Sequence, residues 1–128
     1  MITFSQLGSK GRLGNQLWQI ASTMGLAKSN FDDKYAFPEW PYRKHFKRGY
    51  ELPFIDLSKQ PYLPVRIKET QFHYNENYKY SFTPSHLNEF DGYLQSYKYF
   101  EEIEQVVRDQ FEFADELTSK SISLLPNN

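Results

Sequence analysis

The sequence predicts an α/β domain in which helices flank a parallel β-sheet. Three observations predict this fold class: a β-rich run over residues 2–7 that ends at a glycine turn, an amphipathic run over 13–27, and a second β-rich run over 34–40. Strand, turn, helix and strand in this order form a βαβ unit, whose strands lie parallel. Because 128 residues suit one hydrophobic core, we expect a single domain over 1–128.

The helix over 13–27 has the clearest pattern in the chain. Its apolar residues follow one helix face: Leu13, Leu17, Ile20, Ala21, Met24 and Ala27. The run over 2–7 alternates apolar with polar side chains and ends before Gly8, which is typical of a strand. The run over 34–40 is a shorter strand candidate, because Pro38 cannot donate to a strand ladder.

The middle of the chain, residues 38–64, is expected to be loop-rich because prolines interrupt it repeatedly. Within this region we expect only a short helix, near residues 54–57. The alternation of Val65 and Ile67 with charged residues predicts a strand over 64–70.

The last third of the chain is expected to be mostly helical. A short strand is predicted over 90–96, and Ser96 can cap the helix that follows. That helix, over 97–113, carries an apolar stripe made by Phe100, Ile103, Val107 and Phe111. A further helix is predicted over 114–125.

The charge balance and the composition exclude several partners. Lys and Arg total 15 and Asp and Glu total 16, so no overall field attracts nucleic acid or an anionic membrane. The chain has no cysteine and its three histidines are far apart in sequence, so neither disulfides nor a metal site is expected. No signal peptide or membrane-spanning run is visible, which predicts a cytoplasmic protein, with a membrane-peripheral location as the alternative.

Aromatic residues make up 18 % of a chain that is otherwise polar. Such rings fill cores, and they also form surfaces that bind sugars and bases. Packing of the rings in the core and at the surface is the simpler interpretation. Composition alone does not decide between packing and a binding surface.

Three glycines, Gly8, Gly11 and Gly14, lie between the first predicted strand and the helix. Their spacing, G-x-x-G-x-x-G, matches neither the dinucleotide-binding motif nor the P-loop. The first N–H groups of a helix that follows a parallel strand nevertheless face the carboxyl edge of the sheet, where anions bind. The segment is therefore either a tight turn, with Asn15 or Gln16 as an ordinary cap, or a loop that holds a ligand.

A basic segment over residues 42–51, YRKHFKRGYE, has the densest positive charge in the chain. A solvated surface loop is the simple interpretation, and a lid that approaches a phosphate or a sugar acceptor is the functional one. In the less regular regions, Glu69, His73 and Asp91 are candidates for a general base, and each has a plain surface position as its alternative.

Two parts of the sequence together resemble one family. GRLGNQLWQIA, residues 11–21, resembles the amino-terminal motif of glycosyltransferase family 11, the α-1,2-fucosyltransferases; a similar Gly-Arg-x-Gly-Asn-Gln loop occurs in protein O-fucosyltransferases. KETQFHYN, residues 68–75, and LNEFDGYLQSYKYF, residues 87–100, resemble the same family's glutamate–aromatic segment and its Gly-Tyr-x-Gln-Ser-x-Lys-Tyr-Phe block. Their order and spacing also fit the family.

This resemblance implies the amino-terminal half of a GT-B enzyme, which has two Rossmann-like halves facing a cleft. Such a galactoside 2-alpha-L-fucosyltransferase moves fucose from GDP-fucose to a galactose hydroxyl with inversion and without a metal. The family's donor motif, His-x-Arg-Arg-x-Asp, has no match in this sequence. Because arginines stabilise the pyrophosphate leaving group, this half is expected to bind GDP-fucose weakly and to need a second half, in the same or another polypeptide, for turnover.

The resemblance also implies which residues contact substrate: Gly11, Arg12, Leu13, Gly14, Asn15 and Gln16 in the first stretch, and Tyr93, Gln95 and Ser96 in the second. The implied partners are a nucleotide-sugar donor and a galactose-containing glycan, with no cofactor, metal or nucleic acid. The alternative is an inactive remnant or a glycan-binding module with the same fold. An isolated half could also self-associate through exposed apolar surface.

Overall fold

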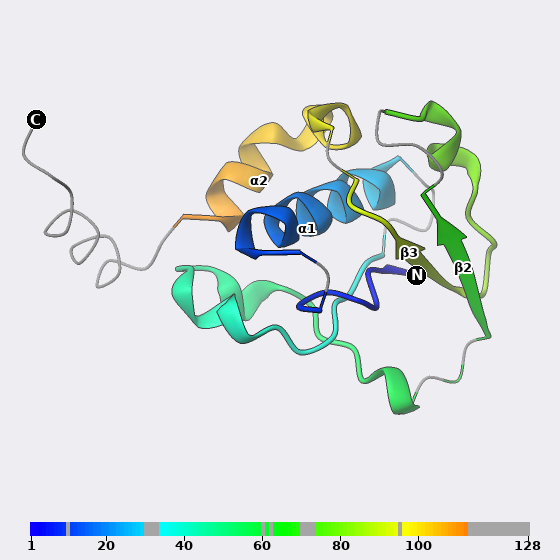
Figure 1. Ribbon diagram of the computed structural model, residues 1–128, viewed down its shortest axis with the longest axis horizontal. Helices are drawn as coiled ribbons and strands as arrows, with labels where there is room; N and C mark the ends of the chain where they lie inside the picture. Colours follow the sequence, from blue (N-terminus) through cyan, green and yellow to red (C-terminus); the bar gives the residue numbers. More distant parts are fainter. Residues whose placement is uncertain are drawn as a thin grey trace, which may run out of the picture.

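The structure, a computed structural model, contains a small parallel β-sheet with helices packed against it (Figure 1). β1 (Ile2–Thr3) pairs with β3 (Leu87–Asp91), which pairs on its other side with β2 (Pro64–Lys68). Both pairings are parallel, and the strand order is β1-β3-β2. The residues that the structure describes are 1–9, 11–29, 34–59, 61, 63–69, 74–94 and 96–112.

Single parallel bridges continue the sheet beyond β1. One joins Ile2 to Tyr35, and another joins Phe37 to Phe54. The predicted run over 34–40 therefore does lie beside the first strand, although it forms bridges instead of a full strand. These pairings and the flanking helices confirm an α/β fold with a parallel sheet.

The amino-terminal strand is shorter than the sequence predicts. Instead of continuing to Leu7, the chain makes two successive turns, in which the N–H of Leu7 donates to the Phe4 carbonyl at 3.1 Å and that of Ser9 donates to the Gln6 carbonyl at 3.0 Å. These local hydrogen bonds replace ladder bonds, so the alternating pattern of residues 2–7 gives only a two-residue strand.

The other two strands differ from the prediction in where they end. The predicted strand over 64–70 is confirmed as β2, which ends at Lys68. The strand predicted over 90–96 lies too late, because β3 ends at Asp91 and the chain then turns with positive φ at Gly92 and Leu94. The short helix expected near 54–57 is a 3₁₀ turn at Leu57–Lys59.

α1 (Leu13–Lys28) confirms the predicted first helix and lies between α2 and the segment around residues 41–59 (Figure 1). Its apolar side chains join the main core, whose fully buried rings are Phe4 directly after β1, Phe37 in a bridge, and Phe90 in β3. A smaller cluster of Ala36, Ile55 and Leu87 forms separately from this core. Alternate residues of the strands thus enter different clusters, as the pleat of a sheet requires.

The long helix predicted over 97–113 is wrong over its first half. Two 3₁₀ turns, Tyr97–Tyr99 and Glu101–Ile103, precede α2 (Glu104–Gln110). The break lies at Phe100, whose backbone is not helical (φ −133°, ψ 14°) and whose ring packs on Trp18 at a centroid distance of 5.5 Å. Tertiary packing of this ring therefore overrides the helical period. The helix predicted over 114–125 lies outside the described residues.

Candidate functional site

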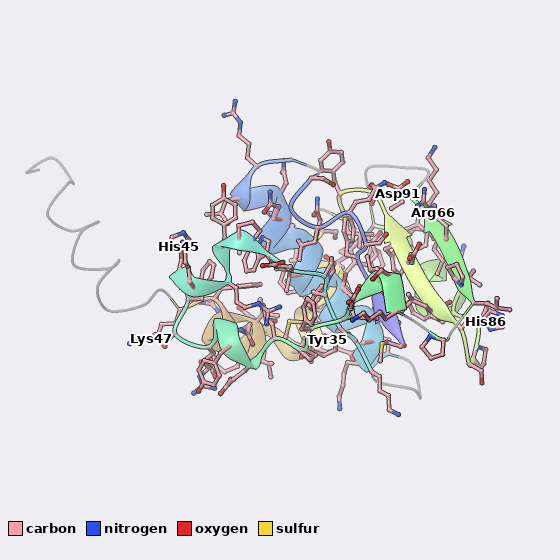
Figure 2. The ribbon with its side chains drawn as sticks, turned by 90° about the horizontal axis from the view of Figure 1, so that it is seen from below. Tyr35, His45, Lys47, Arg66, His86 and Asp91 are labelled. Atoms are coloured by element: carbon pink, nitrogen blue, oxygen red, sulfur yellow. The ribbon has the colours of Figure 1, made fainter. Side chains whose placement is uncertain are left out.

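The carboxyl edge of the sheet collects the segments that the sequence singled out. Because β1, β2 and β3 are parallel, the chain leaves all three strands at the same edge. The glycine segment follows β1, Glu69 follows β2, and Tyr93 and Ser96 follow β3. Figure 2 shows this edge at Asp91 and the opposite edge at His86.

The amino-terminal end of α1 has no neutralising side chain of its own. Arg12, and not Asn15 or Gln16, is the N-cap residue, and its side chain makes no capping hydrogen bond. The first turn also lacks an acidic residue. Arg12 and Gly14 are exposed, and a Cβ at Gly14 would meet no atom within 4 Å. This open, positive end of a helix suits an anionic ligand.

Gln16 supports the glycine loop from inside. Its side chain is 3 % exposed, its Nε2 donates to the Gly11 carbonyl at 3.1 Å, and its Oε1 accepts from the indole N–H of Trp40 at 2.8 Å. Gly11 has φ 80°, and a Cβ there would lie 2.6 Å from Nδ2 of Asn15. In this conformation Gln16 shapes the loop, whereas Arg12 and Gly14 face solvent.

The second predicted segment, residues 92–96 with the predicted contacts Tyr93, Gln95 and Ser96, begins where β3 ends. The Leu94 carbonyl accepts a hydrogen bond from the Ser22 hydroxyl of α1 at 2.8 Å, which ties the turn to the helix. Ser96 accepts from the N–H of Lys98 at 3.3 Å, so its predicted role as a cap is confirmed. Tyr93 is half-buried, and Gln95 lies outside the described residues.

The two predicted segments lie along one helix and not against each other. Ser22, which meets the second segment, is nine residues beyond Leu13, or roughly 14 Å along α1. A single phosphate cannot reach both. An extended ligand, with an anionic group at one end and hydroxyl groups at the other, spans such a distance.

The candidates for a general base lie in different settings. Glu69 directly follows β2, and its carboxylate accepts from the backbone N–H groups of Tyr93 and Leu94. Asp91, the last residue of β3, is 8 % exposed. His73 lies outside the described residues.

Tyr99 lies close to this edge and is 2 % exposed. Its hydroxyl accepts from the N–H of Asn75 at 2.9 Å. Burial raises the pKa of Tyr99 to about 12; the Asn75 hydrogen bond opposes this shift, and the charge of Glu69 adds to it. The phenol therefore stays neutral in the folded chain at pH values where an exposed tyrosine ionises.

We expect Tyr99 to destabilise the fold at alkaline pH. The pKa of Tyr99 is about 12 in the folded chain, against 10 for an exposed tyrosine. The stability that the neutral side chain provides is therefore intact below pH 10, and it is lost as pH rises to 12 because the tyrosine of the unfolded chain ionises first. The loss amounts to roughly 2 to 3 kcal/mol. Tyr99→Phe should cost about 1 kcal/mol at pH 8 for the lost hydrogen bond, and this difference should shrink or reverse by pH 12. Urea unfolding of both chains at each pH measures it; parallel curves would contradict the prediction.

The basic segment lies beside the glycine loop and not over the end of β3. The side chain of Trp40, which precedes it, bonds to Gln16, and Figure 2 shows His45 and Lys47 far across the molecule from Asp91. Arg43 Nη1 donates to the Leu52 carbonyl at 2.7 Å, and Lys47 forms an ion pair with Glu112 at 3.1 Å. Two of the cations thus support local structure, which favours the interpretation as a surface segment.

Two hollows of the described surface lie beside α1, α2 and the 3₁₀ turns that precede α2. One of about 250 Å³ touches the predicted site only at Gly14 and is otherwise apolar, with walls from Leu17, Trp18, Ala21, Phe100, Val107 and Phe111. Within the described ranges, no group of three His, Asp or Glu side chains could hold a metal ion. Nor does any helix in that part of the chain have the length and apolar character to cross a membrane.

Comparisons with models of protein families, with curated proteins and with solved structures found no match for this chain. The structure adds residues to the site that the sequence did not single out. Ser22 and Trp40 hold the two predicted segments in place through side-chain hydrogen bonds. No pattern in the sequence indicated Ser22, which is buried on α1 beside other polar side chains, Gln19 and Thr23.

Proposed function

We propose that this chain is an α-1,2-fucosyltransferase-like glycosyltransferase domain, the first Rossmann-like half of a GT-B enzyme. It binds GDP-fucose and, when a second half completes the site, transfers fucose with inversion to a galactoside hydroxyl. One observation carries the proposal: the stretch 11–21 follows β1 and the residues after Asp91 follow β3 at the same edge of a parallel sheet, and the hydrogen bond from Ser22, the residue next after the first stretch, to Leu94 ties the second stretch to α1. That edge is where α/β folds bind nucleotides.

The residues of this edge have separate tasks in the proposed reaction. Departure of GDP leaves negative charge on a phosphate oxygen, which the positive end of α1 and the exposed Arg12 stabilise. Gly14 lets the ligand approach the helix backbone closely. Farther along α1, Tyr93 and Ser96 lie where the sugar would extend. Asp91 is the candidate base that would take the proton of the acceptor hydroxyl.

Titration of GDP-fucose into the full chain, followed by NMR, tests the proposal. We expect weak binding, with a Kd of roughly 1 mM, and chemical-shift changes at residues 11–16. Arg12→Ala should weaken the affinity about 10-fold or more, because it removes a charged contact to phosphate. Lys44→Ala, which removes an exposed cation from the basic segment, is the matched control and should leave the affinity unchanged.

Two outcomes would overturn the proposal. One is the absence of shift changes at residues 11–16 at several millimolar GDP-fucose. The other is binding of a galactoside that GDP does not influence, together with no nucleotide binding, which would favour a glycan-binding module. Equal loss of affinity in Arg12→Ala and Lys44→Ala would show that the nucleotide sugar is held by general charge attraction and not by a specific site at the end of α1.

A further inference from the structure

Glu69 joins the end of β2 to the turn that follows β3. Its Oε1 accepts the backbone N–H of Tyr93 at 3.0 Å, and its Oε2 accepts that of Leu94 at 3.2 Å. Its own N–H donates to the Asp91 carbonyl at 2.7 Å. Both oxygens of one carboxylate thus hold two consecutive N–H groups, and such charge-assisted pairs fix orientation as well as distance.

The turn at residues 92–94 has a shape that depends on this support. Leu94 has φ 49°, a conformation that residues other than glycine rarely adopt. A Cβ at Gly92 would lie 2.9 Å from Oε1 of Glu69 and would overlap its Cβ, so only glycine admits the carboxylate. From the helix side, the Ser22 hydroxyl donates to the Leu94 carbonyl at 2.8 Å. The turn is therefore held between sheet and helix.

We propose that Glu69 is a positioning residue, whose carboxylate fixes the turn at residues 92–94 and thereby places Tyr93 and Ser96 for contact with the sugar. The identity of the ligand rests on the proposed function, whereas the role in the turn rests on the hydrogen bonds alone. A base role conflicts with this one, because a proton taken up by Glu69 would weaken both bonds to the turn. The task of the base then falls to another group.

The amide signals of Tyr93 and Leu94 provide the direct test. In a pH titration of the full chain by NMR, both amide shifts should follow the protonation of one carboxylate, since each N–H donates to it. Glu69→Gln should abolish that pH dependence. The matched control is Glu89→Gln, which changes a half-buried glutamate of β3 and should leave both titration curves unchanged.

Affinity for GDP-fucose tests whether the turn serves the ligand. Glu69→Ala should weaken binding about 10-fold and speed amide exchange at Tyr93 and Leu94 by a similar factor, because it removes two charge-assisted hydrogen bonds. Glu69→Gln keeps one acceptor oxygen, so its affinity should fall only about 3-fold. If Glu69→Ala does not fold, Glu69→Gln supplies both measurements.

The outcomes separate this inference from the proposed function. Amide shifts of Tyr93 and Leu94 that ignore both pH and Glu69→Gln would overturn the role in the turn. Amides that respond, with an affinity that neither variant changes, would overturn the role in placing the ligand. If the unmodified chain binds no nucleotide sugar, the proposed function fails and the ligand part fails with it, while the amide signals still decide how the turn is held.

Discussion

Gly25→Ala is expected to lower the free energy of unfolding by about 3 kcal/mol, the upper end of the usual cost of overpacking. Gly25 lies where α1 crosses the 3₁₀ turn at Tyr97–Tyr99. A Cβ there would lie 2.6 Å from Cα of Phe100 and would overlap the Tyr99 carbonyl oxygen. Because both are backbone atoms, the whole segment must shift. Urea unfolding followed by circular dichroism measures the loss, and Gly25→Val should prevent folding.

The same helix offers a control with the opposite sign. A Cβ at Gly14 meets no atom within 4 Å, so Gly14→Ala should gain up to about 1 kcal/mol from helix propensity alone. Gly25→Ala brings the same gain in helix propensity, so the energetic cost of the clash must exceed that gain. Equal effects of the two substitutions would mean that α1 does not pack against this turn as described. Gly14→Ala should separately weaken GDP-fucose binding, because it covers the helix end.

The parts of the fold that the sequence predicts are those with a local cause. α1 and β2 follow from periodic patterns within the elements themselves. β1 is only two residues long because turn hydrogen bonds over residues 4–9 replace its ladder bonds, and the alternating pattern does not encode these turns. The 3₁₀ turns before α2 depend on the packing of Phe100 against Trp18, a contact between residues far apart in sequence. Where tertiary contacts set the limits of an element, propensity alone places them wrongly.

The candidate site also has parts with a local cause and parts that depend on contacts between distant residues. The glycine spacing leaves open a tight turn, with Asn15 or Gln16 as a cap, and a loop that holds a ligand; in the structure the helix end has no side-chain cap. The supports of the site could not be predicted, because they join distant residues: Ser22 to Leu94 across 72 positions, and Glu69 to Tyr93 across 24. A glutamate in a loop therefore looks like a candidate base until its hydrogen bonds are known.

Gln16→Ala is expected to cost about 3 kcal/mol of stability, mainly through one buried donor. It removes the acceptor of the Trp40 indole N–H, and Trp40 is 2 % exposed and stacked on Phe46 at a centroid distance of 5.6 Å. Water therefore cannot replace the lost bond without opening the core. The Gly11 carbonyl loses its donor too, but Gly11 is exposed and gains water instead. Chemical denaturation followed by circular dichroism measures the total.

A double-mutant cycle with Trp40→Phe isolates the hydrogen bond from the packing. In the Trp40→Phe background no buried indole N–H is left, so Gln16→Ala should cost at least about 1 kcal/mol less than in the unmodified chain. Gln16→Glu adds a test by pH: a carboxylate in this buried position is unfavourable, so the variant should be more stable, relative to the unmodified chain, at pH 4 than at pH 7. Additive effects and a flat pH response would show that Gln16 and Trp40 act independently. Coupling between Gln16 and Trp40 would instead make Gln16 a structural support of the glycine loop. Arg12 and the open end of α1 would then be the groups of this loop that contact the ligand.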